Sequence, residues 1–131
     1  MKLTIDQFKC PSLNKSYAGR HWSKRYAEAR TIQELVGYLC AAQEIGSVKM
    51  YPVDIRITAS YKSKIRRDSG NISNKEIIDG LVLAGVLEDD STKYVRWVAT
   101  RAIIGKEDKV KVEIMEVIDH PYIEKLEGGE K

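Results

Sequence analysis

The chain has 131 residues, of which 43% are hydrophobic and 31% are charged, and its formal net charge is +3. This length suits one domain, and the apolar content excludes general disorder. The small net charge does not establish a polyanionic partner, and no apolar run is long enough to span a membrane.

The first half of the chain predicts two strands and one helix. Residues 2–8 read as a strand, and apolar residues at steps of three and four predict a helix over 23–45, with Ser23 as N-cap and Gly46 as stop. Strict alternation over residues 53–61 predicts a half-buried strand. Its expected core face carries Val53, Ile55, Ile57, Ala59 and Tyr61, and its expected solvent face carries Asp54, Arg56, Thr58 and Ser60.

The second half predicts a short helix and two further strands. Ser73 followed by Glu76 matches a capping box, and the helix that it opens ends near Gly85. The segment 93–101 reads as a strand with one face formed by Val95, Trp97 and Ala99, and the other by Tyr94, Arg96 and Val98.

A hairpin turn is expected at residues 105–108, followed by a strand over 109–117 with Val110, Val112 and Ile114 facing inward. The order of elements predicts a small α/β (α+β) domain with a mixed sheet and two main helices. We assign residues 1–118 to this domain and 119–131 to a flexible acidic C-terminal tail.

Basic residues gather in two segments. Residues 15–30 mix an excess of positive charge with aromatic rings, which suits a nucleic-acid backbone, although the rings could equally anchor the start of a helix while the charges face water. A second basic run covers residues 62–67. The candidate DNA-binding residues are Lys15, Arg20, His21, Lys24, Arg25, Lys62, Lys64, Arg66 and Arg67.

The two cysteines, Cys10 and Cys40, are expected to be buried thiols of a cytoplasmic protein, because no secretory signal precedes Asp6 and no second cysteine pair exists. A zinc site is disfavoured, since it would need both cysteines together with His21 and His120 and no Cys-x-x-Cys spacing is present.

Carboxylates flank the second helix, with Asp68 before it and Asp89 and Asp90 after it. If the strands on either side were antiparallel neighbours, Asp68 and Asp90 would lie side by side, and a cation would be needed to join them. Mg²⁺ is the expected ion. Lys75, in the first helical turn, is expected to lean toward the Asp68 loop and to stabilise charge on a phosphate. Each residue also has an ordinary role in a turn, a solvated surface or a helix end.

These motifs together resemble the RusA family of Holliday-junction resolvases. The resemblance covers about residues 11–117, and it rests on the following motifs: Pro11-Ser12-Leu13-Asn14, Arg66-Arg67-Asp68 with Asn71, Lys75, Asp79, Ala84-Gly85-Val86, and Glu88-Asp89-Asp90-Ser91. It implies a homodimeric, Mg²⁺-dependent endonuclease that cuts four-way DNA junctions in recombination and repair, with Mn²⁺ as a further candidate ion. A phage or prophage origin fits the resemblance.

The resemblance implies that Asp68, Lys75 and Asp90 are catalytic and that Asp68, Asn71, Asp89 and Asp90 are the candidate metal ligands. The family pattern Asp-x-Asp-Asn-x-x-Lys is altered here, since one residue is extra and Gly70 or Asn71 stands where a second Asp is expected.

Three functions stay open at this point. The first is junction cleavage, with the basic residues holding phosphates and two sites on a symmetric dimer nicking paired strands. The second is junction binding by a nuclease-impaired relative, and the third is a basic module that binds an acidic protein. Steep salt dependence would separate DNA binding from the third.

Overall fold

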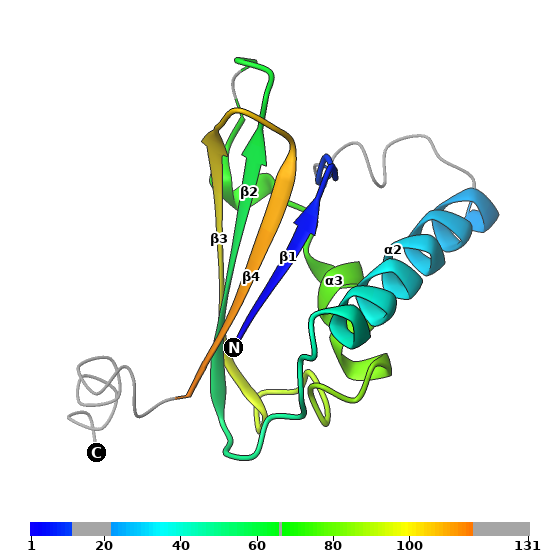
Figure 1. The fold of residues 1–131 in the computed structure, drawn as a ribbon, viewed down its shortest axis with the longest axis vertical. Helices are drawn as coiled ribbons and strands as arrows, with labels where there is room; N and C mark the ends of the chain where they lie inside the picture. The colour runs from blue at the N-terminus through cyan, green and yellow to red at the C-terminus, as the bar shows by residue number, and fades with distance from the viewer. Residues whose placement is uncertain (12–21, 66, 117–131) are drawn as a thin grey trace.

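A computed structural model describes residues 1–11, 22–65 and 67–116, and it has the α+β architecture expected from the sequence. The elements, in chain order, are β1 (Lys2–Asp6), α2 (Trp22–Ala42), β2 (Val53–Tyr61), the 3₁₀ turn η1 (Ser69–Asn71), α3 (Lys75–Leu83), β3 (Val95–Ile104) and β4 (Lys109–Glu116). The expected tail lies outside the described residues. Figure 1 shows both helices on one side of the sheet.

The four strands form one mixed sheet in the order β1-β4-β2-β3. Strand β4 is antiparallel to both β1 and β2, whereas β2 and β3 are parallel. The parallel pair follows from the connection, because α3 provides the crossover that parallel strands require. The predicted hairpin of β3 and β4 is wrong, since β2 lies between these two strands.

Strand β2 occupies the predicted residues, but it is buried on both faces. Asp54, Thr58 and Ser60 were expected to face water and are at most 6% exposed, whereas Arg56 remains exposed. The reason is the central position of β2 between β4 and β3. Asp54 is compensated by Arg96, whose guanidinium donates to both carboxylate oxygens at 3.1 and 2.8 Å.

A register shift in β3 overturns the predicted faces of that strand. Val53 pairs with Val95, but the next residue, Asp54, pairs with Trp97, so one extra residue stands on the β3 side. Val95 is therefore buried at 7% exposure, whereas Trp97 is 43% exposed. The two residues do not share a face as the alternation suggested.

The hydrophobic core lies between the sheet and the two helices. The inward residues of β4 are buried as predicted, and the larger fully buried side chains include Leu3, Ile5, Val36, Ile55, Ile57, Ile77, Leu81, Leu87, Val110 and Val112. Helix α2 begins at Trp22 rather than after a Ser23 cap, and it ends before Gly46, with Glu44 at a positive φ of 56°.

The ends of α3 agree in part with the sequence. Ser73 Oγ donates to Glu76 at 3.1 Å, but the helix begins only at Lys75, and the N-cap residue Asn74 makes no side-chain capping bond. The expected capping box, in which side chains bond to backbone N–H groups, is thus replaced by a hydrogen bond between the two side chains. Gly85 follows the helix at a φ of 78°, a conformation that favours glycine at a helix C-terminus.

Close contact between α2 and α3 depends on Gly80. A Cβ atom at this position would lie 2.8 Å from Val36 Cβ, whereas one at Gly37, in the middle of α2, would meet nothing within 4 Å. We expect Gly80→Ala to lower the free energy of unfolding by about 1–3 kcal/mol through overpacking. Gly37→Ala should instead raise it by up to about 1 kcal/mol through helix propensity. Chemical denaturation measures both, and equal effects would contradict this packing.

Cys10 and Cys40 are buried free thiols, as predicted. Cys10 connects three segments, because its Sγ donates to the Ser73 carbonyl at 3.4 Å and its own carbonyl accepts from Tyr61 Oη at 2.8 Å. Burial raises the pKa of Cys10 to about 12 and that of Tyr61 to about 12.

These two pKa values predict a loss of stability in alkali. The ordinary pKa values are 9.0 for a cysteine thiol and 10.0 for a tyrosine hydroxyl, so the unfolded chain releases these protons first and binds fewer protons than the folded chain up to about pH 12. The free energy of unfolding should therefore fall as the pH rises through this range. In guanidinium titrations at several pH values, the free energy of unfolding of Tyr61→Phe should fall less steeply above pH 10 than that of the wild type. An unchanged slope would contradict the assignment for Tyr61.

Candidate active site and nucleic-acid interface

A small hollow of about 270 Å³ brings Asp90 against the outer side of α3. Its walls are Gln33, Asp79, Val82, Leu83 and Asp90. Asp79, Val82 and Leu83 share one side of the helix because they are three and four residues apart. The loop that follows α3 then places Asp90 beside them, so two carboxylates from different segments line one space.

Lys75 joins this group through Asp79 rather than through Asp68. Its Nζ lies 3.5 Å from the Asp79 carboxylate one helical turn away. The Lys75 side chain is 67% exposed and that of Asp79 is 29% exposed, so the ammonium remains accessible to a ligand. Asp79 was not assigned a role from the sequence. The signal that could have found it is its i, i+4 spacing from Lys75.

Asp89 fixes the backbone at the entrance to this hollow. Its Oδ1 accepts the Asp90 backbone N–H at 2.8 Å. This hydrogen bond, together with a side-chain bond from Ser91, holds the pKa of Asp89 below its usual value. Asp89 is therefore ionised at neutral pH and orients Asp90; that it is also a metal ligand stays a prediction.

Asp68 belongs to the segment before β3 rather than to the lining of this hollow. It precedes η1, which packs along β3: Thr100 Oγ1 donates to the Ser69 carbonyl at 2.7 Å, and the Ala102 N–H donates to Ser69 Oγ at 3.0 Å. The antiparallel strand pairing that was expected to bring Asp68 beside Asp90 is wrong, because β2 and β3 are parallel. Asp68 does not line the Asp90 hollow. Its catalytic role stays a prediction, as does metal binding by Asn71, whose side chain lies outside the described part.

Among the described residues, the carboxylates beside α3 do not form a closed metal cage. Within residues 1–11, 22–65 and 67–116, no group of three or more His, Cys, Asp or Glu side chains could hold a metal. Mg²⁺ commonly needs only one or two carboxylates, with substrate phosphates and water completing its shell. Asp79 and Asp90 meet that minimum.

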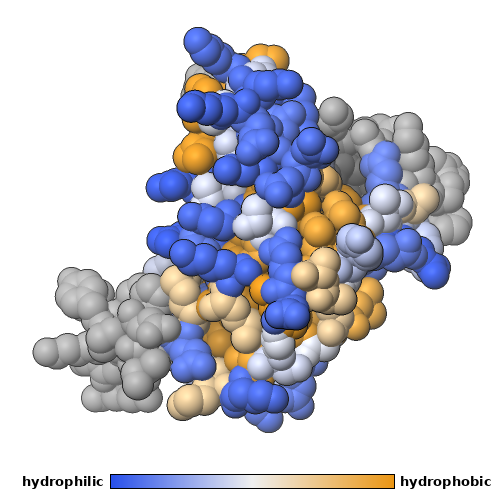
Figure 2. All heavy atoms as spheres, in the orientation of Figure 1, coloured by the Kyte–Doolittle hydropathy of each residue, from blue (hydrophilic) through white to orange (hydrophobic). Residues whose placement is uncertain are grey.

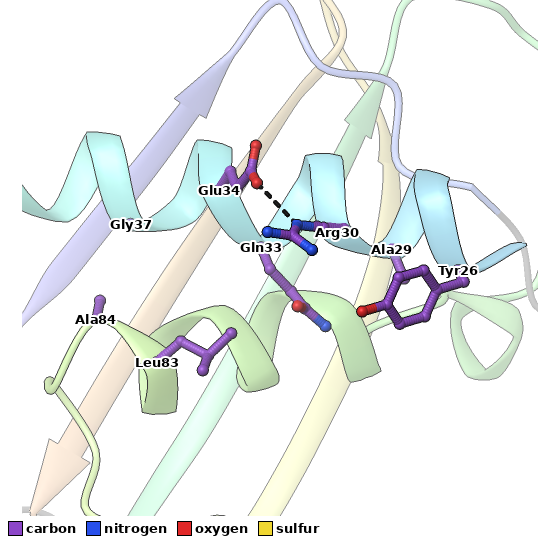
Figure 3. Close-up of a pocket in the computed structure, with 8 residues that line it drawn as sticks. All are labelled: Tyr26, Ala29, Arg30, Gln33, Glu34, Gly37, Leu83 and Ala84. Atoms are coloured by element: carbon purple, nitrogen blue, oxygen red, sulfur yellow. Dashed lines mark hydrogen bonds and ion pairs between the residues drawn. The ribbon is translucent and has the colours of Figure 1, made fainter.

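A larger hollow of about 420 Å³ runs between α2 and α3 (Figure 3). It shares Gln33 and Leu83 with the Asp90 hollow, so the two hollows are neighbours. Figure 3 shows Tyr26 at one end and the Arg30–Glu34 pair, joined at 3.1 Å, on the α2 side.

The basic run after β2 is held at the end of the sheet. The Arg67 guanidinium lies 4.0 Å from the Tyr61 ring centroid, and the Lys62 N–H donates to Asp108 at 2.9 Å. Lys62 and Lys64 are exposed. Figure 2 shows this end, uppermost in the view, as largely hydrophilic with a few hydrophobic groups. The remaining predicted DNA contacts lie outside the described residues or have side chains that are not described: Lys15, Arg20, His21, Lys24, Arg25 and Arg66.

Comparison with protein-family models finds no match, and comparison with curated proteins finds none either. None of the helices in the described part of the chain is long and apolar enough to cross a membrane.

Proposed function

We propose that the protein is a metal-dependent, structure-specific endodeoxyribonuclease that resolves four-way DNA junctions during recombination or repair. The observation that carries this proposal is the hollow beside α3, which is lined by Asp79 and Asp90, with the ammonium of Lys75 3.5 Å from the Asp79 carboxylate. Two acidic groups and one cation around an open space match the needs of phosphodiester hydrolysis.

Each residue has a role in this proposal. Asp79 and Asp90 would hold the ion, and Asp89 orients the Asp90 backbone. Bound there, Mg²⁺ would supply Lewis-acid polarisation of the phosphate and a more acidic water. Lys75 contributes a positive charge next to the scissile phosphate, and its distance to Asp79 keeps that charge at the hollow.

Substrate positioning is assigned to cations outside the hollow. Lys62 and Lys64 would hold phosphates of a duplex arm without reading its sequence. A homodimer would present two such sites to strands related by two-fold symmetry, which suits paired nicking.

A cleavage assay tests this proposal. It uses a labelled synthetic four-way junction and a linear duplex of the same sequence, each incubated with and without Mg²⁺ or Mn²⁺. Nicks in opposite strands of the junction, dependent on metal and absent from the duplex, are expected. Binding of the junction with no nicks under any metal condition would favour a nuclease-impaired junction-binding protein, the second candidate.

The second candidate is favoured by the lack of a three-acid group in the described residues and by Gly70 at the position of an expected Asp. A side chain fits there, since a Cβ at Gly70 would meet nothing within 4 Å. If the metal is held at the loop before η1 rather than beside α3, and a missing charge there limits activity, Gly70→Asp should raise junction cleavage severalfold over wild type, with Gly70→Asn as the uncharged control. Equal rates for both variants would count against an electrostatic loss.

A further inference from the structure

An apolar hollow of about 410 Å³ lies where β2 and β3 end side by side. Its walls are Tyr61, Ile65, Arg67, Ala102, Ile103 and Ile104. Two of them are unusually exposed for isoleucine, with Ile65 at 68% and Ile104 at 61%. The volume falls in the range of about 300–1,000 Å³ typical of small-molecule sites. The nuclease site proposed above does not use this hollow.

Arg67 forms a fixed, flat wall of the hollow. Its guanidinium lies 4.0 Å from the Tyr61 ring centroid, and its Nη1 donates to the carbonyls of Ser63 and Ile65 at 3.2 and 3.0 Å. Tyr61 is itself held by the hydrogen bond from its hydroxyl to Cys10. A guanidinium plane held in this way is a stacking surface for a nucleobase.

The charges around the hollow favour an anionic ligand with a flat apolar part. Lys62 and Lys64 are exposed on the same loop as Ile65, and the nearby Asp108 carboxylate accepts the Lys62 backbone N–H. Cations at the rim and aliphatic walls inside suit one nucleotide of a DNA strand, with its phosphate outside and its base within. A purely apolar peptide would gain nothing from the cations.

We infer that this hollow takes one unstacked nucleobase of DNA, stacked on Arg67 between Ile65 and Ile104, while Lys62 and Lys64 hold the adjoining phosphates. The inference rests on the proposed action on DNA and specifies the feature that is recognised. Base pairs at a branch point or bulge open more easily than those in a continuous duplex, so the hollow would favour such DNA.

Fluorescence anisotropy at fixed salt tests this with a labelled duplex that carries one unpaired thymine and a fully paired duplex of otherwise identical sequence. Wild type is expected to bind the bulged DNA at least fivefold more tightly, the lower end of the effect of stacking one base. Arg67→Lys, which keeps the charge and loses the plane, and Ile65→Ser should bring this ratio close to one. Met50→Ala is the matched control, because Met50 is 60% exposed and lies before β2, at the other end of that strand.

The ratio of the affinities for the bulged and the paired duplex decides whether the inference holds. A ratio lost in Arg67→Lys and Ile65→Ser but kept in Met50→Ala supports the inference. Equal binding of both duplexes by wild type, or a ratio that survives both substitutions, overturns it and leaves the proposed nuclease function standing. Failure of wild type to bind either DNA contradicts the proposed function as well.

Discussion

Replacing Asp90 with asparagine is expected to lower the rate of junction cleavage by more than about 100-fold, while junction affinity measured without metal changes little. The substitution removes one of the two carboxylates that line the hollow beside α3. Loss of an outer partner of a metal site alone costs about 10–100-fold, so loss of a direct ligand should cost more. Asp90 is exposed, so folding should not be affected.

Single-turnover cleavage with labelled arms measures this effect, with gel retardation as the binding readout. Glu88→Gln is the matched control, since it removes one exposed negative charge from the same loop without touching the hollow. Cleavage by Asp90→Asn at the wild-type rate would refute the role given to Asp90.

Removing Lys62 and Lys64 together should lower DNA affinity by roughly 50-fold at 0.1 M salt and reduce the slope of log affinity against log salt by about 1.8. Both values follow from the loss of two phosphate contacts, each of which contributes about 0.9 to the slope of log affinity against log salt. The two side chains are exposed on the loop after β2, so their removal leaves the core intact.

Binding isotherms at several salt concentrations test this expectation. The double variant Lys49→Ala and Lys93→Ala has the same change in net charge, and both of its residues lie at the start of β2 and β3 rather than at their ends. If both double variants lost the same affinity, binding would depend on total charge and not on the basic loop.

Local patterns in the sequence were sufficient for the individual elements. Strand β2 matches the predicted range 53–61, because five apolar residues alternate without interruption over nine positions. The buried apolar residues Val110, Val112 and Ile114 of β4 follow from the same alternation, whereas the burial of Glu113 between them does not. The apolar stripe of α2 also predicted a helix, although its start and end differed by one to three residues.

The pairing of strands that are distant in the sequence could not be predicted from such local patterns. A short turn between β3 and β4 suggested a hairpin, but the pairing energy of β2 with both strands is a property of the whole sheet. One extra residue at Arg96 then reversed the faces of β3, which no alternation count could detect.

The candidate site, too, could be predicted only in part from the sequence. Asp90 and Lys75 were selected from spacing and resemblance, and the structure places Lys75 at the start of α3 and Asp90 against the same helix. Asp68 was expected beside Asp90 on the assumption of antiparallel strands, and the parallel pair removes that reason. Asp79 takes its position because α3 turns it toward the loop that carries Asp90, a relation set by tertiary packing.

The location of the active site is tested most directly by single-turnover cleavage of a four-way junction with Mg²⁺. This experiment compares Asp79→Asn with Asp68→Asn. The exposed ion pair with Lys75 contributes little to stability, so the Asp79 variant should fold normally. We predict that Asp79→Asn loses cleavage by more than about 100-fold while it still binds the junction. Wild-type cleavage by Asp79→Asn, with activity lost only in Asp68→Asn, would contradict the site beside α3 and move it to the loop before η1.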